Sequence, residues 1–514
     1  MKIMRVFSFV LILAMLLASF VSCVESDPSA SDASKQTETS KETEKTESEE
    51  PSLPSDVSRE ASEEISEEPS EERGPLDHLE TQFLDCDIII LSEEGGGTYR
   101  PKEIAADEET VISQFVKERN DLVEDKLGVR IKERRTGDMA RELRNAALNT
   151  PDFDIAMPFM TTAGPLITED VFCDLFEFDV IRFNEPYWDA NAVSSLSLGN
   201  KLYIATGDFS VNTIDVTHCM IFNKDVVTKY SLESPYTLVS EGRWTLDKML
   251  EMAKAVTAES DGIEGITYKD TIGLFINNNY SNSLYIGSGQ SFVSKDANDM
   301  PYLAMNNEYS ANVVQKVFDV FHDDAVIRLE SFSSQARADG YNDCYWAGRD
   351  RLANGNALFD TISLNAVLNM ASYDANFGFL VTPKYSEEQD GYHSYISIIY
   401  ATGCVIPIGN EDPEKAALVL EALCASSTST VKFNYYDRIL KIQQTRDEES
   451  EEMLDLILNS RVYDLGALYN WGGIRDFLTD ICATGSTNTF VSSYAAKEGT
   501  FLDAMNKTVE FLGE

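Results

Sequence analysis

The sequence has little positive charge. Lysine and arginine number 42 against 87 aspartate and glutamate residues, and the formal charge is −45. Nucleic-acid-binding proteins need a basic surface that releases counterions from the phosphates, so this composition argues against nucleic acid as a partner. It argues equally against electrostatic docking on an anionic lipid surface. With 43% hydrophobic and 10% aromatic residues over 514 positions, the chain still has enough apolar material for two large lobes or for two to four domains.

Histidine and the common catalytic motifs are scarce or missing. The four histidines are scattered singly: His78, His218, His322 and His393. This spacing predicts no metal centre, and no motif indicates a cofactor. The segment Asp296-Ala297-Asn298-Asp299 resembles part of a calcium loop but lacks the following glycine and the distal glutamate, which favours a hairpin turn. The sequence also contains no phosphate-binding G-x-x-x-x-G-K-[ST], no G-x-S-x-G and no H-E-x-x-H, so we expect a protein that is not an enzyme.

The cysteines form no C-x-x-C pair and no zinc-like cluster. They are Cys23, Cys86, Cys173, Cys219, Cys344, Cys404, Cys424 and Cys482. Most lie among apolar neighbours, where a free cysteine packs as a small core residue. One disulfide is possible, but the sequence does not indicate which cysteines would form it.

The first residues read as a targeting segment. Lys2 and Arg5 precede an apolar run over residues 6–20, and small residues follow at 21–22. This pattern predicts a signal peptide over residues 1–22, and the run is short for a transmembrane helix. Phe20-Val21-Ser22-Cys23 resembles the lipobox of bacterial lipoproteins, which implies lipidation of Cys23 and anchoring at the extracellular face of the cell membrane. The alternative is an ordinary signal peptide followed by a chance cysteine.

An acidic, polar stretch follows Cys23. Residues 24–73 contain 17 acidic and 5 basic side chains, a net charge of −12. Such a segment cannot bury enough apolar surface to offset its chain entropy, and its like charges keep it extended. We therefore expect a disordered tether over residues 23–80. The rest of the chain carries a net charge of about −35 and is expected to have a strongly acidic surface.

Strand and helix patterns alternate after the tether. Short apolar runs predict strands at 87–91, 129–131 and 154–157. Between them, apolar residues at helical spacing predict helices over 107–127 and 139–148; Gly128 ends the first and Asp138 caps the second. Strand–helix–strand–helix–strand predicts a doubly wound α/β lobe, in which ligands bind at the carboxyl ends of the strands.

A second block repeats the alternation. Residues 219–223 read as a strand that runs into a turn, and residues 199–205 as a hairpin arm or a crossover strand. Trp244-Thr245 is expected to open a helix, with Thr245 as the N-cap and Trp244 in the core. Two more helices are predicted, one from Asp412-Pro413 and one over 447–460.

Seven short motifs stand in the order and spacing of a known family. They are Asp152-Phe153-Asp154-Ile155, Asp174-Leu175, Gly199-Asn200-Lys201-Leu202-Tyr203, Ile221-Phe222-Asn223-Lys224-Asp225, Trp244-Thr245-Leu246-Asp247, Asn354-Gly355-Asn356-Ala357-Leu358-Phe359 and Asp412-Pro413-Glu414-Lys415-Ala416. Over residues 85–514 the chain resembles the extracellular solute-binding proteins of bacterial ABC importers, family 1, the maltose-binding-protein-like class. The resemblance implies an α/β, two-lobed periplasmic-binding-protein-like fold (type II), in which each lobe is a central sheet flanked by helices and hinge crossover strands join the lobes.

The same resemblance implies the domain organisation. The crossings would lie near residues 206–210 and 396–402. Lobe 1 would comprise residues 84–207 and 397–444, and lobe 2 residues 208–396 and 445–514. Two rigid lobes on few strands can hinge, and a ligand that contacts both lobes favours the closed state. We therefore expect the chain to capture a small solute, in the first place a carbohydrate.

Carbohydrate sites need polar groups for the hydroxyls and flat aromatic rings for the apolar sugar faces. Matching loops give the candidates Thr161, Thr162, Asp208, Ser210, Asn365, Tyr469 and Trp471. Each has an alternative: Thr161 and Thr162 could cap a helix, Asp208 could be a turn residue, and Trp471 could be either a platform in the cleft or a core residue. Asn365 stands where sugar binders of this class often carry tryptophan, which argues against a stacked, maltose-like oligosaccharide.

The resemblance also implies the partners. They would be the small solute, the transmembrane permease subunits with their cytoplasmic ATPase, and the membrane through the lipid on Cys23; the chain itself would act as a monomer. Two other readings stay open. A secreted glycoside hydrolase needs only two carboxylates, which sequence alone cannot pick out of 87 acidic residues, although the chain lacks eight β/α units. A surface-binding lipoprotein without a transport role is the third.

Overall fold

The chain divides into two compact units, Met1–Ser70 and Glu71–Glu514, and the described residues all belong to the second unit. The computed structural model describes residues 74–513 except 82–83, 96–102, 107–111, 371 and 443–447. The expected signal peptide, Cys23 and the tether up to residue 73 therefore lie outside the described residues. Along the part of the chain that is described, no helix is long and apolar enough to cross a membrane.

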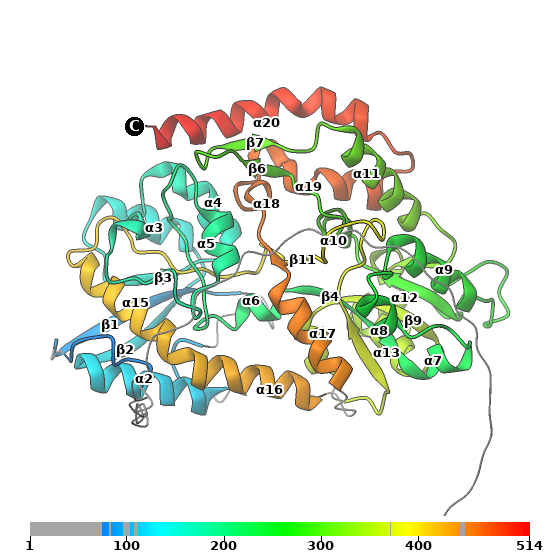
Figure 1. The fold of residues 1–514 in the computed structure, drawn as a ribbon, viewed down its shortest axis with the longest axis horizontal. Coiled ribbons are helices and arrows are strands. Elements are labelled where there is room, and N and C mark those ends of the chain that lie inside the picture. Colours follow the sequence, from blue (N-terminus) through cyan, green and yellow to red (C-terminus); the bar gives the residue numbers. More distant parts are fainter. Residues whose placement is uncertain are drawn as a thin grey trace, which may run out of the picture. The chain divides into compact units, whose positions relative to one another are not determined.

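The first lobe is built on a parallel sheet with the strand order β2-β1-β3 (Figure 1). Its strands are β2 (Val129–Thr136), β1 (Cys86–Glu93) and β3 (Ile155–Met157). Two further segments continue the sheet through antiparallel bridges, Ala156 to Val405 and Ala205 to Cys404. Ile88, Ile90 and Leu91 of β1 are buried, as the apolar run predicts for a strand with helices on both faces.

Local signals set the boundaries of the helices in this lobe. Gly128 adopts the left-handed conformation (φ 64°) directly after α2, and the Asp138 side chain accepts a hydrogen bond from the Arg141 amide at the start of α3, so both predicted boundaries are confirmed. The helices around the first sheet are α2 (Ser113–Leu127), α3 (Met139–Leu148), α4 (Met160–Leu166), η1 (Ile167–Glu169), η2 (Leu175–Glu177), α5 (Ala190–Leu196) and α15 (Pro413–Ser427). The predicted cap of α15 is confirmed as well, because the Asp412 carboxylate accepts from the Lys415 amide.

The second lobe is built on a five-stranded mixed sheet with the order β10-β4-β9-β5-β8. Its strands are β10 (Phe377–Leu380), β4 (His218–Asn223), β9 (Ala357–Ser363), β5 (Ile272–Ile276) and β8 (Val326–Arg328). Strands β9, β5 and β8 are parallel, whereas β4 runs antiparallel to both β9 and β10. The strand predicted at 219–223 is confirmed as β4.

Helices cover this sheet on both faces (Figure 1). They are α7 (Lys224–Lys229), α8 (Pro235–Ser240), α9 (Leu246–Val256), α10 (Tyr280–Gly287), α11 (Glu308–Phe321), η3 (Leu329–Phe332), α12 (Ser333–Ala338), α13 (Cys344–Ala353), η4 (Leu364–Ala366) and α14 (Val367–Met370). The Thr245 hydroxyl caps α9 by accepting from the Lys248 amide, and the buried Trp244 indole donates to the Val381 carbonyl at 2.9 Å. Both interpretations, an N-cap and a core tryptophan, are confirmed.

Two segments cross between the sheets. The first passes through α6 (Asn212–Asp215) and enters β4. The second pairs with β3 through Val405, with Phe159 just beyond β3 through Thr402, and with the first segment through Ile396. A third connection runs from α15 through a π-helical turn, η5 (Thr428–Lys432), and α16 (Phe433–Ile442) to α17 (Glu448–Asn459), which lies against β10. The two-lobed fold with hinge crossover strands is therefore confirmed.

The C-terminal elements lie along both lobes. After α17 come β12 (Arg461–Val462), which pairs with β11 (Ser394–Tyr395), and then α18 (Leu465–Tyr469), η6 (Trp471–Gly473), α19 (Ile474–Leu478), η7 (Thr479–Thr484) and α20 (Phe490–Leu512). Helix α18 packs on α4, and α20 covers η6 and the hairpin of β6 (Val293–Lys295) and β7 (Pro301–Leu303). The segment Asp296–Asp299 is the turn of that hairpin, where the Asp296 carboxylate accepts from the amides of Asn298 and Met300.

The end of the expected tether requires a correction. Leu76 and Leu79 are buried and His78 bonds to Glu421, so residues 74–80 pack on the first lobe. The expected boundary at residue 80 is therefore too late. Two leucines three residues apart hold this segment on the fold in spite of its acidic surroundings.

Candidate functional site

The carboxyl ends of the strands in lobe 1 carry a small polar cluster. At the end of β1, the Glu93 carboxylate accepts from the Phe159 amide and from the Thr162 hydroxyl, each at 2.9 Å, and burial raises the pKa of this carboxyl. The Thr161 hydroxyl donates to the Ile399 carbonyl at 3.3 Å. The predicted pair Thr161 and Thr162 thus lies at the strand ends, on the first turn of α4, and each hydroxyl makes a contact within the lobe.

The corresponding edge of lobe 2 has polar atoms without partners. Strand β5 ends at Ile276, and Asn278 and Asn282 follow on the loop and on α10. The side-chain carbonyl oxygens of both asparagines, and Nε of Arg475 on α19, are buried and form no hydrogen bond with any described residue. The side-chain amide of Asn282 donates to the backbone carbonyl of Arg475 at 3.0 Å, which places these two residues side by side.

The loop around Asn278 is held firmly. Glu330 lies just beyond β8, and both of its carboxylate oxygens accept from the backbone amide of Asn278 at 3.1 Å. The Tyr345 hydroxyl donates to the same carboxylate at 3.0 Å. The bond to Glu330 places the Tyr345 hydroxyl just beyond the end of β8, and Tyr345 is 37% exposed. On the other lobe Tyr400, 38% exposed, packs edge-on against Phe159 with 6.0 Å between ring centroids.

The second crossing connects the two strand-end edges through a short segment. Thr402 pairs with Phe159 at the end of β3, and Ile396 pairs with Thr217 next to the start of β4. Six residues separate these two pairings along the second crossing, and an extended chain of that length spans at most about 20 Å. The second crossing thus links the carboxyl edge of one sheet to that of the other.

His218 opens β4 at the same edge. Its Nδ1 lies 2.6 Å from the Ser283 hydroxyl, and its ring stacks on Tyr280 with 5.6 Å between centroids. Burial lowers the pKa of this imidazole to about 4, so His218 is neutral at pH 7. Asn365, predicted at this edge, is buried there, and its side-chain oxygen accepts from the Ser363 hydroxyl at 2.8 Å.

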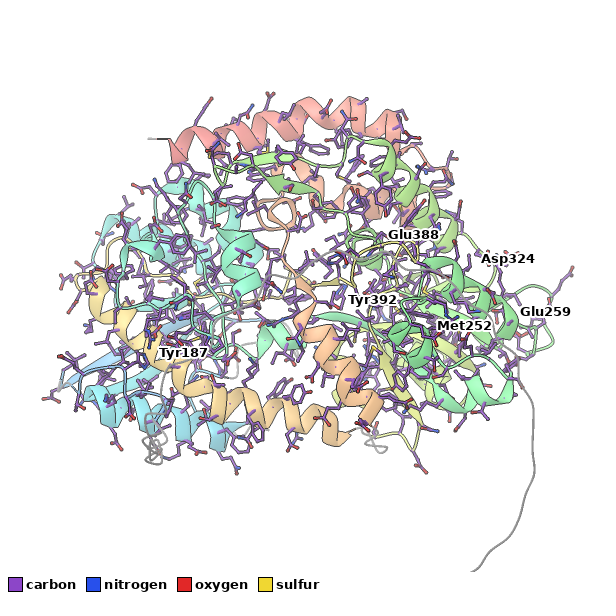
Figure 2. The ribbon with its side chains drawn as sticks, in the orientation of Figure 1. Tyr187, Met252, Glu259, Asp324, Glu388 and Tyr392 are labelled. Atoms are coloured by element: carbon purple, nitrogen blue, oxygen red, sulfur yellow. The ribbon has the colours of Figure 1, made fainter. Side chains whose placement is uncertain are left out.

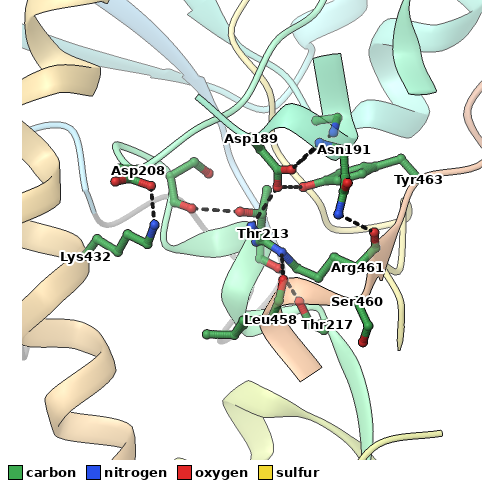
Figure 3. Close-up of polar contacts among 12 residues, drawn as sticks. Asp189, Asn191, Asp208, Thr213, Thr217, Lys432, Leu458, Ser460, Arg461 and Tyr463 are labelled. Carbon is green, nitrogen blue, oxygen red and sulfur yellow. Dashed lines mark hydrogen bonds and ion pairs between the residues drawn. The ribbon is translucent and has the colours of Figure 1, made fainter. Parts of the chain in front are cut away.

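Asp208 and Ser210 line a pocket of about 220 Å³ between the first crossing and helices α16 and α17. Lys432 Nζ lies 2.6 Å from Oδ1 of Asp208 (Figure 3). The Thr428 hydroxyl donates to Oδ2 of the same carboxylate at 2.8 Å. Burial raises the pKa of Asp208, while Lys432 opposes that shift. The Ser210 hydroxyl lies 3.1 Å from that of Thr402. The charge on Asp208 is already paired, so this junction pocket is less suited to a sugar than the strand-end edges.

A second ion pair closes the same pocket. The Arg461 guanidinium lies 2.7 Å from the Asp189 carboxylate, which also accepts from the Tyr463 hydroxyl at 2.8 Å (Figure 3). Asp189 caps α5 as well, by accepting from the amides of Asn191 and Ala192. These contacts join Asp189 of lobe 1 to β12 and to the residue that follows it.

Tyr469 and Trp471 are both buried. Their rings stack on each other 4.6 Å apart, and Trp471 is only 4% exposed. The Trp471 indole donates to the Thr508 hydroxyl of α20 at 2.8 Å. Neither residue lines the junction pocket. The burial of Trp471 under α20 agrees with the alternative prediction that Trp471 is a core residue.

Sequence reasoning missed Asn278, Asn282, Arg475, Tyr345 and Tyr400. A run of three asparagines directly after an apolar strand, over residues 277–279, was the one available signal. In this fold, polar residues directly after parallel strands point to a ligand site. The seven described cysteines are all free, so none of them forms the disulfide that the sequence left possible.

Comparisons with known proteins give the same fold. No family model matches the chain, and no curated protein matches it in sequence. Among solved structures, a cyclo/maltodextrin-binding protein complexed with maltotetraose is similar with a TM-score of 0.53 and 13% identity, over 83% of this chain and 96% of the other. An ABC substrate-binding protein from Listeria monocytogenes in complex with cycloalternan has a TM-score of 0.50 and 14% identity, over 83% of this chain and 100% of the other.

A third solved structure is the maltose-binding periplasmic protein MalE from Listeria monocytogenes in complex with maltose. Its TM-score is 0.52 at 14% identity, and the match covers 82% of this chain and 98% of that one. At such identities the likeness establishes the fold: this chain has the two-lobed α/β fold of ABC substrate-binding proteins.

Proposed function

We propose that the chain is the solute-binding protein of an ABC importer, that it captures a carbohydrate between its two lobes by hinge closure, and that it delivers the sugar unchanged to a permease. The observation that carries this proposal is a set of buried polar atoms that form no hydrogen bond with a described residue. They are the side-chain oxygens of Asn278 and Asn282 and Nε of Arg475, which lies 3.6 Å from the Asp476 carboxylate. Asn278 and Asn282 follow the end of β5 in lobe 2, and Arg475 bonds to Asn282.

The chemistry of these atoms suits hydroxyl groups. A buried polar atom without a partner costs about 1–3 kcal/mol, and a ligand that supplies the missing hydrogen bond removes that cost. A sugar hydroxyl donates to the two asparagine oxygens and accepts from the arginine. Glu93 and Glu330 at the same edges favour a neutral sugar over an anionic one, and Tyr345 and Tyr400 offer exposed rings for its apolar faces.

The fold supports the same function. The three similar proteins are described as complexes with maltotetraose, cycloalternan and maltose, all of them neutral oligosaccharides. Two sheets joined by crossing segments can close around a ligand that contacts both. We place the lobes at residues 84–207 with 397–444 and at 208–396 with 445–514, with closure about the crossings.

The anchoring belongs to the same proposal. We propose that Cys23 is lipidated after removal of residues 1–22, and that the folded unit acts as a monomer on the extracellular face of the membrane. Several acyl chains on one cysteine bind strongly, because each buried methylene contributes about 0.8 kcal/mol. The permease subunits are the protein partners.

The test is calorimetric titration of the protein with maltose, maltotetraose and cycloalternan, together with mass spectrometry of any solute that co-purifies. We expect at least one sugar to bind, and Asn278→Ala and Asn282→Ala each to weaken its binding about tenfold or more. Asn298→Ala, in the exposed hairpin turn, is the matched control and should leave the affinity unchanged. Binding that both site variants leave intact would refute the site. New reducing ends after incubation would instead identify a glycoside hydrolase.

A further inference from the structure

Glu421 of α15 is a fully buried carboxylate in lobe 1. It accepts from the Trp188 indole at 2.9 Å, from the Arg182 amide at 3.1 Å and from the Tyr187 hydroxyl. Its fourth contact is with Nε2 of His78 at 3.1 Å. A buried charge is tolerated only when hydrogen bonds surround it, so each of these contacts matters for this carboxylate.

His78, which makes the fourth contact, lies 343 residues before Glu421 in the sequence. Residues 74–80 form a turn in which the Gly74 amide donates to Asp77, and Leu76 and Leu79 are buried. The His78 ring stacks on Tyr187 with 6.4 Å between centroids. This segment, which we call the strap, is thus held by two apolar side chains and one polar contact, immediately after the acidic stretch that precedes it in the sequence.

Tyr187 links the strap to the first crossing. Its carbonyl accepts from the Asp208 amide at 2.8 Å and from the Cys424 thiol at 3.0 Å. A Cβ on Gly207 would lie 2.5 Å from both the Tyr187 carbonyl oxygen and the Cys424 sulfur, so only glycine allows this approach. Figure 2 labels Tyr187 beside α15. The crossing therefore leaves lobe 1 in close contact with the residue on which His78 stacks.

Residues along one side of α15 and η5 contact both the strap and the first crossing. Glu421 holds the strap, Cys424 contacts Tyr187, and Thr428 and Lys432 bind the Asp208 carboxylate. The π-helical turn over Thr428–Lys432 presents both of its end residues to that single carboxylate. Such turns are rare and often occur at functional positions.

We propose that the strap is a conformational latch that couples the N-terminal end of the folded unit to the hinge. His78 on Glu421 fixes Tyr187, and Tyr187 holds the start of the first crossing at Asp208. Release of the strap loosens this end of the crossing without any change in the residues of the strand-end edges.

The test is hydrogen exchange of the full-length chain and of its His78→Ala variant, followed by mass spectrometry. We expect exchange about tenfold or more faster in peptides that contain the Asp208 amide, which donates to the Tyr187 carbonyl, because the loss of one hydrogen bond to a buried charge corresponds to at least that factor. Peptides from β5 in lobe 2 should exchange as before. His78→Gln retains a donor and should restore slow exchange.

A second variant separates the latch from simple unfolding. Leu76→Ala combined with Leu79→Ala should also speed exchange around Asp208, whereas Leu148→Ala, at an exposed position of lobe 1, should not. The proposal is overturned if the strap variants speed exchange only within residues 74–80. It is overturned equally if exchange rises uniformly over both lobes, because the strap would then contribute only to global stability. Neither readout depends on a bound sugar, so the proposed function can fail without affecting this result.

Discussion

Asp208 on the first crossing and Lys432 on the π-helical turn η5 form an ion pair with 2.6 Å between Oδ1 and Nζ. The two partners differ in burial: the Asp208 side chain is 7% exposed and that of Lys432 is 38% exposed. The lysine can reach water when its partner is removed, whereas the carboxylate cannot. Loss of the lysine should therefore destabilise the first crossing more than loss of the aspartate.

This inequality predicts unequal costs for the two single substitutions. Lys432→Met leaves a buried carboxylate without its cation and should lower the free energy of unfolding by about 3–5 kcal/mol. Asp208→Asn retains the hydrogen bond to Thr428 and should cost about 1–2 kcal/mol. Urea unfolding at pH 7 measures both. Equal costs, or a double variant whose loss equals the sum of the single losses, would show that the pair is not coupled as described.

Asp360 predicts a pH dependence of stability. This residue is buried in β9, its Oδ1 forms no hydrogen bond within the described part of the chain, and burial raises the pKa of its carboxyl to about 7. Since the ordinary pKa is 3.8, the stability that the protonated acid contributes is complete below pH 4 and is lost as the pH rises towards 7. Asp360→Asn should therefore gain stability relative to wild type between pH 5 and pH 8, on the order of 2–4 kcal/mol. A difference between variant and wild type that stays constant over this range would contradict the assignment.

Thr508 tests whether Trp471 belongs to the core. Thr508→Val removes the acceptor of the buried Trp471 indole and should cost about 1–3 kcal/mol of stability, with no change in sugar affinity. Thermal unfolding and calorimetric titration measure the two effects separately. A tenfold loss of affinity at unchanged stability would restore Trp471 as a ligand platform.

Two glycines make a matched pair for packing. A Cβ on Gly273 of β5 would lie 2.2 Å from the Ala253 carbonyl of α9, so Gly273→Ala should destabilise lobe 2 by about 1–3 kcal/mol. Around Gly499 of α20 no described atom lies within 4 Å of the corresponding position, and Gly499→Ala should stabilise by about 0.5–1 kcal/mol. The same urea measurement covers both, and opposite signs are expected. If both variants lost stability, the loss at Gly273 could not be attributed to the clash with the Ala253 carbonyl of α9.

Much of the fold follows from short-range signals in the sequence. The caps Asp138, Thr245 and Asp412 and the glycine at 128 act within one turn of helix, and the structure confirms the boundaries that they predict. The apolar strands and the alternation of elements likewise require no knowledge of distant residues. The family resemblance gave the two-lobed fold, while the exact lobe boundaries that it implies stay a prediction.

The remaining features depend on long-range contacts. The burial of Trp471 depends on α20, which follows more than fifteen residues later and covers it, and the strap depends on Glu421, 343 residues after His78. The site residues Asn278 and Asn282 look like ordinary capping residues in the sequence. Only the structure shows that their side-chain oxygens are buried without a partner among the described residues. Asp208 is paired with Lys432, which the sequence does not show, and its role as a ligand contact stays a prediction.

Closure of the two lobes around a sugar is the central claim, and small-angle X-ray scattering tests it most directly. The radius of gyration of the full-length protein should fall when the sugar identified by titration is added to saturation, and it should not fall for Asn278→Ala combined with Asn282→Ala at the same concentration. A radius that stays the same for the wild-type protein at saturation would contradict capture by hinge closure.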